Sequence, residues 1–231
     1  MKKNDLTILS LGGSIIIPKT GFSIPFLREF REMVLRHVSG GNRLILVVGG
    51  GATCRFYQSA AKQVVDLTNE ELDWIGIHTT VYNAQFVRMI LKDVACENIV
   101  TDPTQKYEMD KPVLIAAGWK PGCSTDNDAV LLAQTYGAKD IINLSNIEFA
   151  YDKDPNVFAD ARPIENISWS DFRSTVVGSE WSPGNSAPFD PIASKTAEEL
   201  GITVRIVLGT DVSRVEKALG GENVPCTLIH P

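Results

Sequence analysis

Short apolar runs alternate along the chain with longer segments in which apolar residues recur at helical spacing. The runs, rich in Val, Ile and Leu, predict buried β-strands. The expected strands are Leu6–Leu11, Arg43–Val48, Asn98–Val100, Val113–Ala117, Asp140–Leu144 and Thr203–Leu208, with Cys226–Ile229 as an edge strand. The periodic segments predict helices over Pro25–His37, Ala52–Val65, Asn69–Asp93, Asp126–Tyr136, Ser168–Val176, Ile192–Leu200 and Val212–Leu219.

The order of these elements, strand then helix then strand again, is typical of an α/β protein. It predicts a mostly parallel central sheet with helices on both faces. In such sheets, ligands bind beyond the carboxyl ends of the strands. The sequence contains no repeat and no low-complexity linker, so we expect a single domain over residues 1–231. The segment Gly178–Pro188, rich in Pro, Ser and Gly, is expected to be a mobile surface loop.

The composition is that of an ordinary globular protein, with 44% hydrophobic and 22% charged residues. A net charge of −6 argues against a general nucleic-acid or membrane-surface binder, and no apolar run reaches the length of a membrane span. Gly12-Gly13 interrupts the first apolar run, which therefore does not fit a secretion signal. The cysteines, Cys54, Cys96, Cys123 and Cys226, form no C-x-x-C pair, so we expect free thiols in a cytoplasmic protein without a zinc site.

Three glycine-containing loops follow predicted strands. Residues 118–128 lead directly into an apolar helix, with Ser124, Thr125 and Asp126 as candidates to cap it. The free N–H groups and positive dipole at a helix start attract phosphate. Gly12-Gly13-Ser14 and Gly49-Gly50-Gly51 could likewise bring backbone N–H groups close to an anion. Together the three loops predict a site for several phosphate groups.

Other residues extend this candidate site. Arg55, one turn into the helix after Gly51, could add a bidentate cation. Asp73 and Gly76 share a helix face, where the carboxylate could accept from a ribose hydroxyl. Asp190 could cap the helix that follows it, line the site, or do both. Ser145 and Asn146, with Tyr151 further on, could contact a second nucleotide.

In this order, the motifs resemble the amino acid kinase superfamily, and most closely its archaeal-type uridylate (UMP) kinases. The matching stretches span nearly the whole chain and include Val47-Val-Gly-Gly-Gly51, Asp73-Trp-Ile-Gly-Ile77, Pro121–Asp126 and Phe189–Lys195. The resemblance implies an αβα sandwich that forms a homohexamer. It also implies phosphorylation of UMP to UDP with ATP and Mg²⁺, within pyrimidine nucleotide synthesis.

The resemblance also implies roles for individual residues. Asp126 and Asp190 would organise the catalytic centre. The UMP-binding residues would be Gly50, Asp73, Gly76, Trp119, Lys120, Pro121, Gly122, Cys123, Ser124 and Thr125. The ATP-binding residues would be Gly12, Gly13, Ser14, Gly51, Arg55, Ser145, Asn146, Tyr151 and Asp154. The resemblance further implies an acceptor-binding part over about residues 1–125 and an ATP-binding part over about residues 126–231.

The chain departs from the family pattern at three positions. Ser10 stands where many members have Lys, Phe149 replaces a glycine beside the nucleotide, and Asp128 adds a carboxylate. Lys19, Lys120 and Lys153 could supply the missing cation. Two alternatives stay open: a kinase for another small phosphate or carboxylate, and a non-catalytic nucleotide or oxyanion binder resembling the molybdenum storage proteins.

Overall fold

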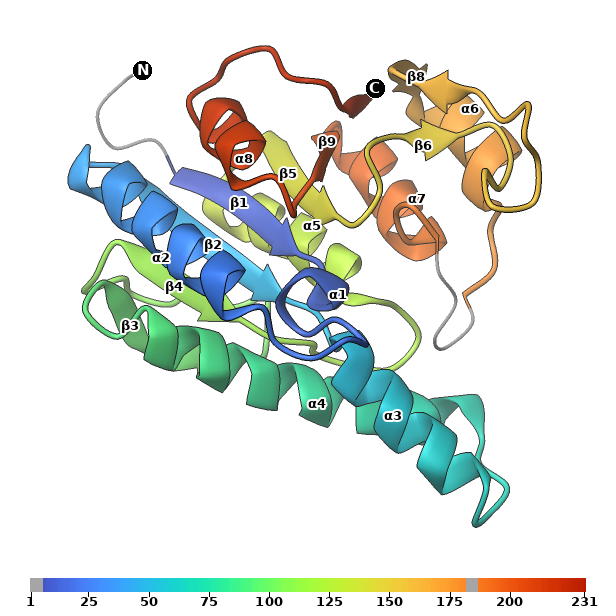
Figure 1. Ribbon diagram of the computed structural model, residues 1–231, viewed down its shortest axis with the longest axis horizontal. Helices are drawn as coiled ribbons and strands as arrows, with labels where there is room; N and C mark the ends of the chain where they lie inside the picture. The colour runs from blue at the N-terminus through green and yellow to red at the C-terminus, as the bar shows by residue number, and fades with distance from the viewer. Residues whose placement is uncertain (1–5, 182–186) are drawn as a thin grey trace.

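The computed structural model describes residues 6–181 and 187–231, in which a central sheet lies between two layers of helices (Figure 1). The strands of the sheet are β1 (Leu6–Leu11), β2 (Arg43–Val48), β3 (Ala95–Val100), β4 (Val113–Ala116), β5 (Asp140–Ser145), β8 (Asn166–Ser168), β9 (Thr203–Leu208) and β10 (Thr227–His230). A separate hairpin pairs β6 (Ala150–Tyr151) with β7 (Pro163–Ile164). The helices are α1 (Gly13–Ile16), α2 (Ile24–Ser39), α3 (Gly51–Lys62), α4 (Asn69–Ile90), α5 (Thr125–Tyr136), α6 (Trp169–Phe172), α7 (Pro191–Leu200) and α8 (Val212–Leu219).

The strand order in the sheet is β3-β4-β2-β1-β5-β9-β10-β8. Neighbouring strands are parallel except for the antiparallel pair β9–β10. The α/β class and the mostly parallel sheet are therefore as the alternating pattern predicts. In a parallel sheet the carboxyl ends of the strands lie at one edge, so the loops after β1, β2, β4 and β5 come together there.

Successive strand residues supply two separate hydrophobic cores. On β2, Leu44, Leu46 and Val48 face the core that packs α2, α4 and α8, while Ile45 and Val47 face the core that packs α5 and α7. Both faces of the central strands are buried, which explains their continuous apolar runs. Burial on both faces fixes the register of each strand, because a slip by one residue would exchange the two faces.

The loops that follow β1 and β2 touch each other through their backbones. A Cβ added at Gly13 would lie only 2.1 Å from the Gly51 nitrogen, and Gly51 adopts φ +61°. Asn83 of α4 lies beside this contact and is fully buried. Its Nδ2 donates to the carbonyl oxygens of Gly49 and Gly50, at 3.0 Å and 2.9 Å. The two glycine clusters thus form one rigid junction.

The main helices and strands begin and end within a few residues of their predicted limits. The exceptions are elements whose apolar pattern in the sequence is short or irregular. The predicted edge position of the last strand is wrong, because β10 lies between β9 and the three-residue strand β8. The helix predicted over Ser168–Val176 is split into α6 and a π-helical turn at Arg173–Val177. Strand β3 begins at Ala95, earlier than its predicted start at Asn98. Its pairing with β4 shifts register between Ala95 and Ile99.

The predicted loop Gly178–Pro188 lies partly outside the described residues, which resume at residue 187. Within the described part of the chain, none of the helices is both long and apolar enough to cross a membrane.

We expect Gly13→Ala to lower the free energy of unfolding by about 3 kcal/mol, the upper end of overpacking effects. The added methyl group would overlap the backbone of Gly51, which has no flexible side chain to move aside. Urea denaturation checks this value. Gly40→Ala is the matched control, because Gly40 has φ −72° and its added Cβ would approach nothing closer than 3.3 Å. Equal stability of the two variants would contradict the rigid junction.

Candidate functional site

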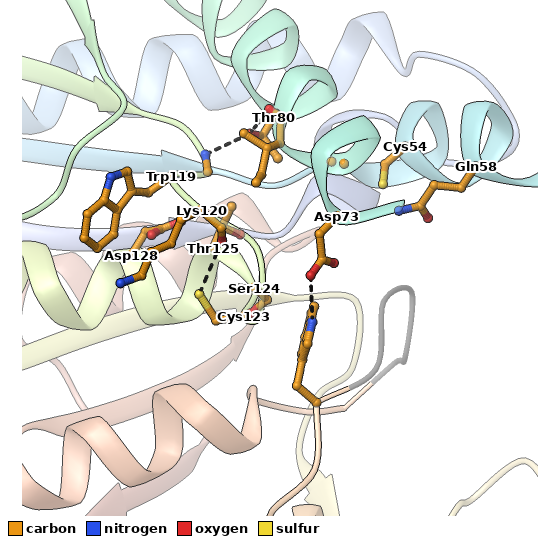
Figure 2. Close-up of a pocket in the computed structure, with 15 residues that line it drawn as sticks. Cys54, Gln58, Asp73, Thr80, Trp119, Lys120, Cys123, Ser124, Thr125 and Asp128 are labelled. Atoms are coloured by element: carbon orange, nitrogen blue, oxygen red, sulfur yellow. Dashed lines mark hydrogen bonds between the residues drawn. The ribbon is translucent and has the colours of Figure 1, made fainter. Parts of the chain in front are cut away.

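A cavity opens at the carboxyl edge of the sheet between α4 and the loop that follows β4. Figure 2 shows Asp73, Cys54 and Gln58 at one end of it and Trp119, Lys120 and Asp128 at the other. Its lining includes most of the residues predicted to bind UMP: Gly50, Asp73, Gly76, Trp119, Lys120, Cys123, Ser124 and Thr125. We call this the acceptor cavity. It brings together residues from α3, α4, the 118–125 loop and α5, which are far apart in the sequence.

Asp73 joins three segments of this cavity. Its side chain projects from the second turn of α4, whose start is fixed by a capping box between Thr68 and Glu71. Asp73 Oδ2 accepts from the Gly122 backbone N–H at 2.8 Å and from Trp181 Nε1 at 3.3 Å. Gly122 and Pro121 do not line the cavity themselves. Gly122 therefore acts on the cavity through Asp73, whereas Trp181 also forms part of its wall.

A second group of polar side chains surrounds Asp126, beside the acceptor cavity. Asp126 Oδ1 accepts from Ser10 Oγ at 3.0 Å and from Asn143 Nδ2 at 2.9 Å. Ser10 lies on β1 and Asn143 on β5, so two adjacent strands aim their side chains at the same carboxylate. Burial, together with the charge of Asp190, raises the pKa of Asp126 to about 6. We call this group the carboxylate centre.

Asp190 connects the carboxylate centre to the helix behind it. Its Oδ1 caps α7 by accepting from the N–H groups of Ile192 and Ala193, at 2.6 Å and 2.8 Å. Its Oδ2 accepts from the Ser124 N–H at 2.6 Å, and its own N–H donates to Asp126 Oδ2 at 3.3 Å. Asp190 is thus both a helix cap and a member of the centre. Of the three candidate caps of α5, Ser124 is the one that accepts from an N–H of its helix.

Asp128 is the most deeply buried carboxyl group in the wall of the acceptor cavity, at 2% exposure. Burial, with the charges of Asp190 and Asp126, raises the pKa of Asp128 to about 8, against the opposing effects of the Trp119 N–H and Lys120. Burial also raises the pKa of the nearby Cys123 thiol to about 12. A thiol with so high a pKa is not a nucleophile at neutral pH.

A second cavity, of about 370 Å³, lies on the far side of β5. Ser145, Asn146, Tyr151 and Asp154, all predicted to bind the ATP nucleoside, line it together with Lys153. Phe149 does not: its side chain lines a different cavity, with Glu165 and Arg205. Phe149 thus lies outside the cavity that Ser145 and Asp154 line, and its expected position beside the nucleotide stays a prediction.

The remaining predicted ATP-binding residues lie outside both cavities. Gly12, Gly13, Ser14 and Gly51 belong to the junction of the loops after β1 and β2. Arg55 is exposed on α3 and lines neither cavity. Among the candidate cations, Lys120 lines the acceptor cavity and stacks on Trp119 at 4.1 Å from its ring centre. Lys153 pairs with Asp160 at 2.7 Å, and Lys19 is exposed.

Several residues of the site were not predicted to take part. Cys54, Gln58, Thr80 and Trp181 line the acceptor cavity, and Asn143 holds Asp126. Thr80 Oγ1 accepts from the Gly118 N–H at 2.8 Å and so fixes the start of the 118–125 loop. Asn143 carried a sequence signal, as a polar residue within an apolar strand. Trp181 carried none, because its contact with Asp73 spans 108 positions.

The described residues contain no group of three or more His, Cys, Asp or Glu side chains placed to hold a metal ion. The site consists of the acceptor cavity, the Ser145–Asp154 cavity, the carboxylate centre and the glycine junction.

Comparison with known proteins agrees with this architecture. The chain is 32% identical to the uridylate kinase of Methanospirillum hungatei, over 92% of this chain and 89% of that protein. It is 27% identical to the uridylate kinase of Methanobrevibacter smithii, over 96% and 98% of the two chains. The crystal structure of uridylate kinase from Archaeoglobus fulgidus superposes with a TM-score of 0.80 at 28% identity, covering 97% of this chain and 99% of that one.

The family-level match covers residues 5–208, which include both cavities and the carboxylate centre. It extends over well more than half of the sequence, and the sheet order places the matching motifs at one edge. The chain belongs to the amino acid kinase family.

Proposed function

We propose that the protein is a nucleoside monophosphate kinase that transfers the terminal phosphoryl group of ATP to UMP, in pyrimidine nucleotide synthesis. The observation that carries the proposal is the acceptor cavity, in which Asp73 and Gly76 of α4 face the Trp119–Thr125 loop beside Asp126. Relatives that match over most of their length are uridylate kinases, which supports the same acceptor.

The acceptor would lie along the cavity, with its ribose at Asp73. Asp73 is an acceptor-only carboxylate, which suits ribose hydroxyl donors. Gly50 and Gly76 line the cavity, and Cys54 packs against both of them. The 118–125 loop, held by Thr80 and Asp73, would wrap the rest of UMP.

ATP would occupy the Ser145–Asp154 cavity, whose volume of about 370 Å³ falls within the usual range of ligand sites. Its phosphates would extend toward the glycine junction, including Gly12, Gly13, Ser14 and Gly51. We thus propose an acceptor-binding part over about residues 1–125 and an ATP-binding part over about 126–231, within one domain.

Phosphoryl transfer between two phosphates needs placement and charge neutralisation more than proton transfer. An oxygen of the UMP phosphate would form the new bond to phosphorus, and the bond to the ADP oxygen would break. The carboxylate centre would hold the helix starts at Ser124 and Asp190 in fixed positions around the reacting phosphates. Mg²⁺ neutralises phosphate charge in such reactions. The described residues offer no cage for it, so we assign it no protein ligand.

We also propose that the protein forms homo-oligomers, with the hexamer as the expected form, in the cytoplasm. Large apolar side chains are exposed on α3, on α4 and on the segment between them: Phe56, Tyr57, Val64, Val65, Trp74, Tyr82 and Met89. An apolar surface of this kind is typical of a protein contact.

We expect the protein to release ADP from ATP with UMP as the preferred acceptor, followed by CMP and, much more weakly, AMP. A pocket that hydrogen-bonds one base edge rejects others by leaving its own polar groups unpaired. Incubation with ATP, Mg²⁺ and a panel of nucleoside monophosphates measures this. Equal turnover of the whole panel would contradict a UMP kinase, and tight nucleotide binding without turnover would favour a non-catalytic binder.

We expect Asp126→Asn to lower kcat by about 10²–10³-fold, the range found when one preorganised polar group is removed from a catalytic site. Asp190→Asn should lower kcat similarly; its amide oxygen can still cap α7, but its NH₂ group cannot accept from the Ser124 N–H, so we expect a stability loss of about 1 kcal/mol. Steady-state kinetics and thermal melting of the same samples check both. If turnover per folded molecule stays at the wild-type level, the two residues are structural only.

We expect Arg55→Ala to weaken ATP or UMP binding by about tenfold, as for loss of one charge-assisted contact. The exposed side chain makes it a poor contributor to stability, so the melting temperature should not change. Isothermal titration calorimetry with each nucleotide tests this. Unchanged affinity for both would remove Arg55 from the site.

A further inference from the structure

The wall of the acceptor cavity contains a buried carboxyl group, that of Asp128, that lacks a complete set of hydrogen-bond partners. Asp128 lies in the first turn of α5 and is 2% exposed. Among the described residues, its Oδ1 has no hydrogen-bond partner. This oxygen is closed to solvent, and an unpaired buried oxygen is costly, above all in the charged form of the group.

The charges around Asp128 decide which part of a nucleotide could meet it. Asp126 and Asp190 add negative charge, and Lys120 is the positively charged group that acts on it from the loop. Cys123, with a pKa of about 12, is neutral. A phosphate anion would be repelled by this surrounding. The Asp128 end therefore suits an uncharged hydrogen-bonding group, which in a nucleotide is the base.

The position of Asp128 relative to Asp73 supports the same orientation. Figure 2 shows Asp73 and Asp128 at opposite ends of the cavity, with Trp119 and Lys120 beside Asp128. With the ribose at Asp73, the base would extend toward Trp119 and Asp128. The aromatic ring of Trp119 offers a flat apolar surface at this end.

We propose, on the basis of the function proposed above, that Asp128 is a specificity-determining residue whose protonated carboxyl group donates a hydrogen bond to a carbonyl oxygen of uracil. Cytosine presents an amino group in place of that carbonyl. A protonated oxygen facing an amino group leaves two donors opposed, so the neutral carboxyl group favours UMP over CMP. An ionised carboxylate would reverse this preference, because it accepts from an amino group and repels a carbonyl oxygen.

The chemistry of the site favours the neutral form near pH 7. Burial and the two neighbouring carboxylates raise the pKa of Asp128 to about 8, from its ordinary value of 3.8. The backbone N–H of Trp119 also acts on this carboxyl group. Ionisation would also place charge on a buried oxygen that has no hydrogen-bond partner among the described residues, which further favours the neutral form.

The test compares Asp128→Ala and Asp128→Asn with the wild type by calorimetric titration of UMP, CMP and ribose 5-phosphate. For Asp128→Ala we expect the Kd of UMP to rise about 10- to 100-fold, as when a buried polar partner is lost, with a much smaller change for CMP. Ribose 5-phosphate, which has no base, should bind as before. Asp128→Asn should retain UMP preference, because its amide NH₂ can donate to the same carbonyl.

Asp140→Asn is the control, since Asp140 is an exposed carboxylate at the start of β5, at the opposite edge of the sheet. A UMP-to-CMP affinity ratio that is unchanged in Asp128→Ala would overturn the proposal. So would an equal loss of UMP and ribose 5-phosphate binding, which would identify Asp128 as a structural residue. UDP formation by the wild type is measured separately: its absence would refute the kinase function, whereas an altered ratio would still assign base recognition to Asp128.

A pH series provides a readout that a structural role would not produce. We expect UMP affinity of the wild type to fall as the pH rises through about 8, while Asp128→Asn stays constant. The free energy of unfolding of the unliganded protein should also depend on the protonation of Asp128. Because the folded state binds this proton more tightly than the unfolded state, unfolding free energy is lost as the pH rises from about 4 to about 8.

This loss of stability should be smaller in Asp128→Asn than in the wild type, as measured by thermal melting across the pH series. Asp126, whose pKa is about 6, is present in both proteins and so largely cancels in the comparison. Parallel pH profiles of the two proteins, in both binding and melting, would show that Asp128 does not carry the proton and would overturn the proposal.

Discussion

The geometry of the site depends on the backbone contact between the loops that follow β1 and β2. Gly13 and Gly51 approach so closely that no Cβ fits between them. This contact fixes where α3 begins, and Asn83 ties the same loop to α4. The position of Asp73 at one end of the acceptor cavity therefore follows from a contact between two glycines that do not line the cavity.

The carboxylate centre fixes the positions of further elements in a similar way, on the other side of β1. Asp126 is held by side chains from β1 and β5 and by the backbone at the start of α7. Three elements that are separate in sequence are thereby locked to one carboxylate. The cost is that Asp126, Asp128 and Asp190 lie together in a buried region, and the raised pKa values of Asp126 and Asp128 result first from burial and then from the neighbouring carboxylates.

Sequence reasoning could predict the layered α/β fold, because the buried strands are long apolar runs and the helices have clear periodicity. It placed most of the candidate acceptor residues correctly at one edge, since parallel strands end together. It failed at β8, a three-residue strand with no apolar run, and at the position of β10, which depends on β8. A motif position does not determine which cavity a residue lines, and Phe149 lines a different cavity from Ser145 and Tyr151.

The contacts of Asp73 with Gly122 and Trp181 have a thermodynamic consequence. One carboxylate oxygen already accepts from the backbone of the acceptor loop and from an indole that follows the π-helical turn. A ligand that donates a hydrogen bond to this carboxylate competes with the Trp181 indole for the lone pairs of the oxygen. Thermodynamic linkage makes this coupling reciprocal. If a ligand at Asp73 changes the equilibrium position of Trp181 by some factor, a change that moves Trp181 alters the ligand affinity at Asp73 by the same factor. The two halves of the chain are thus linked energetically through a single oxygen atom.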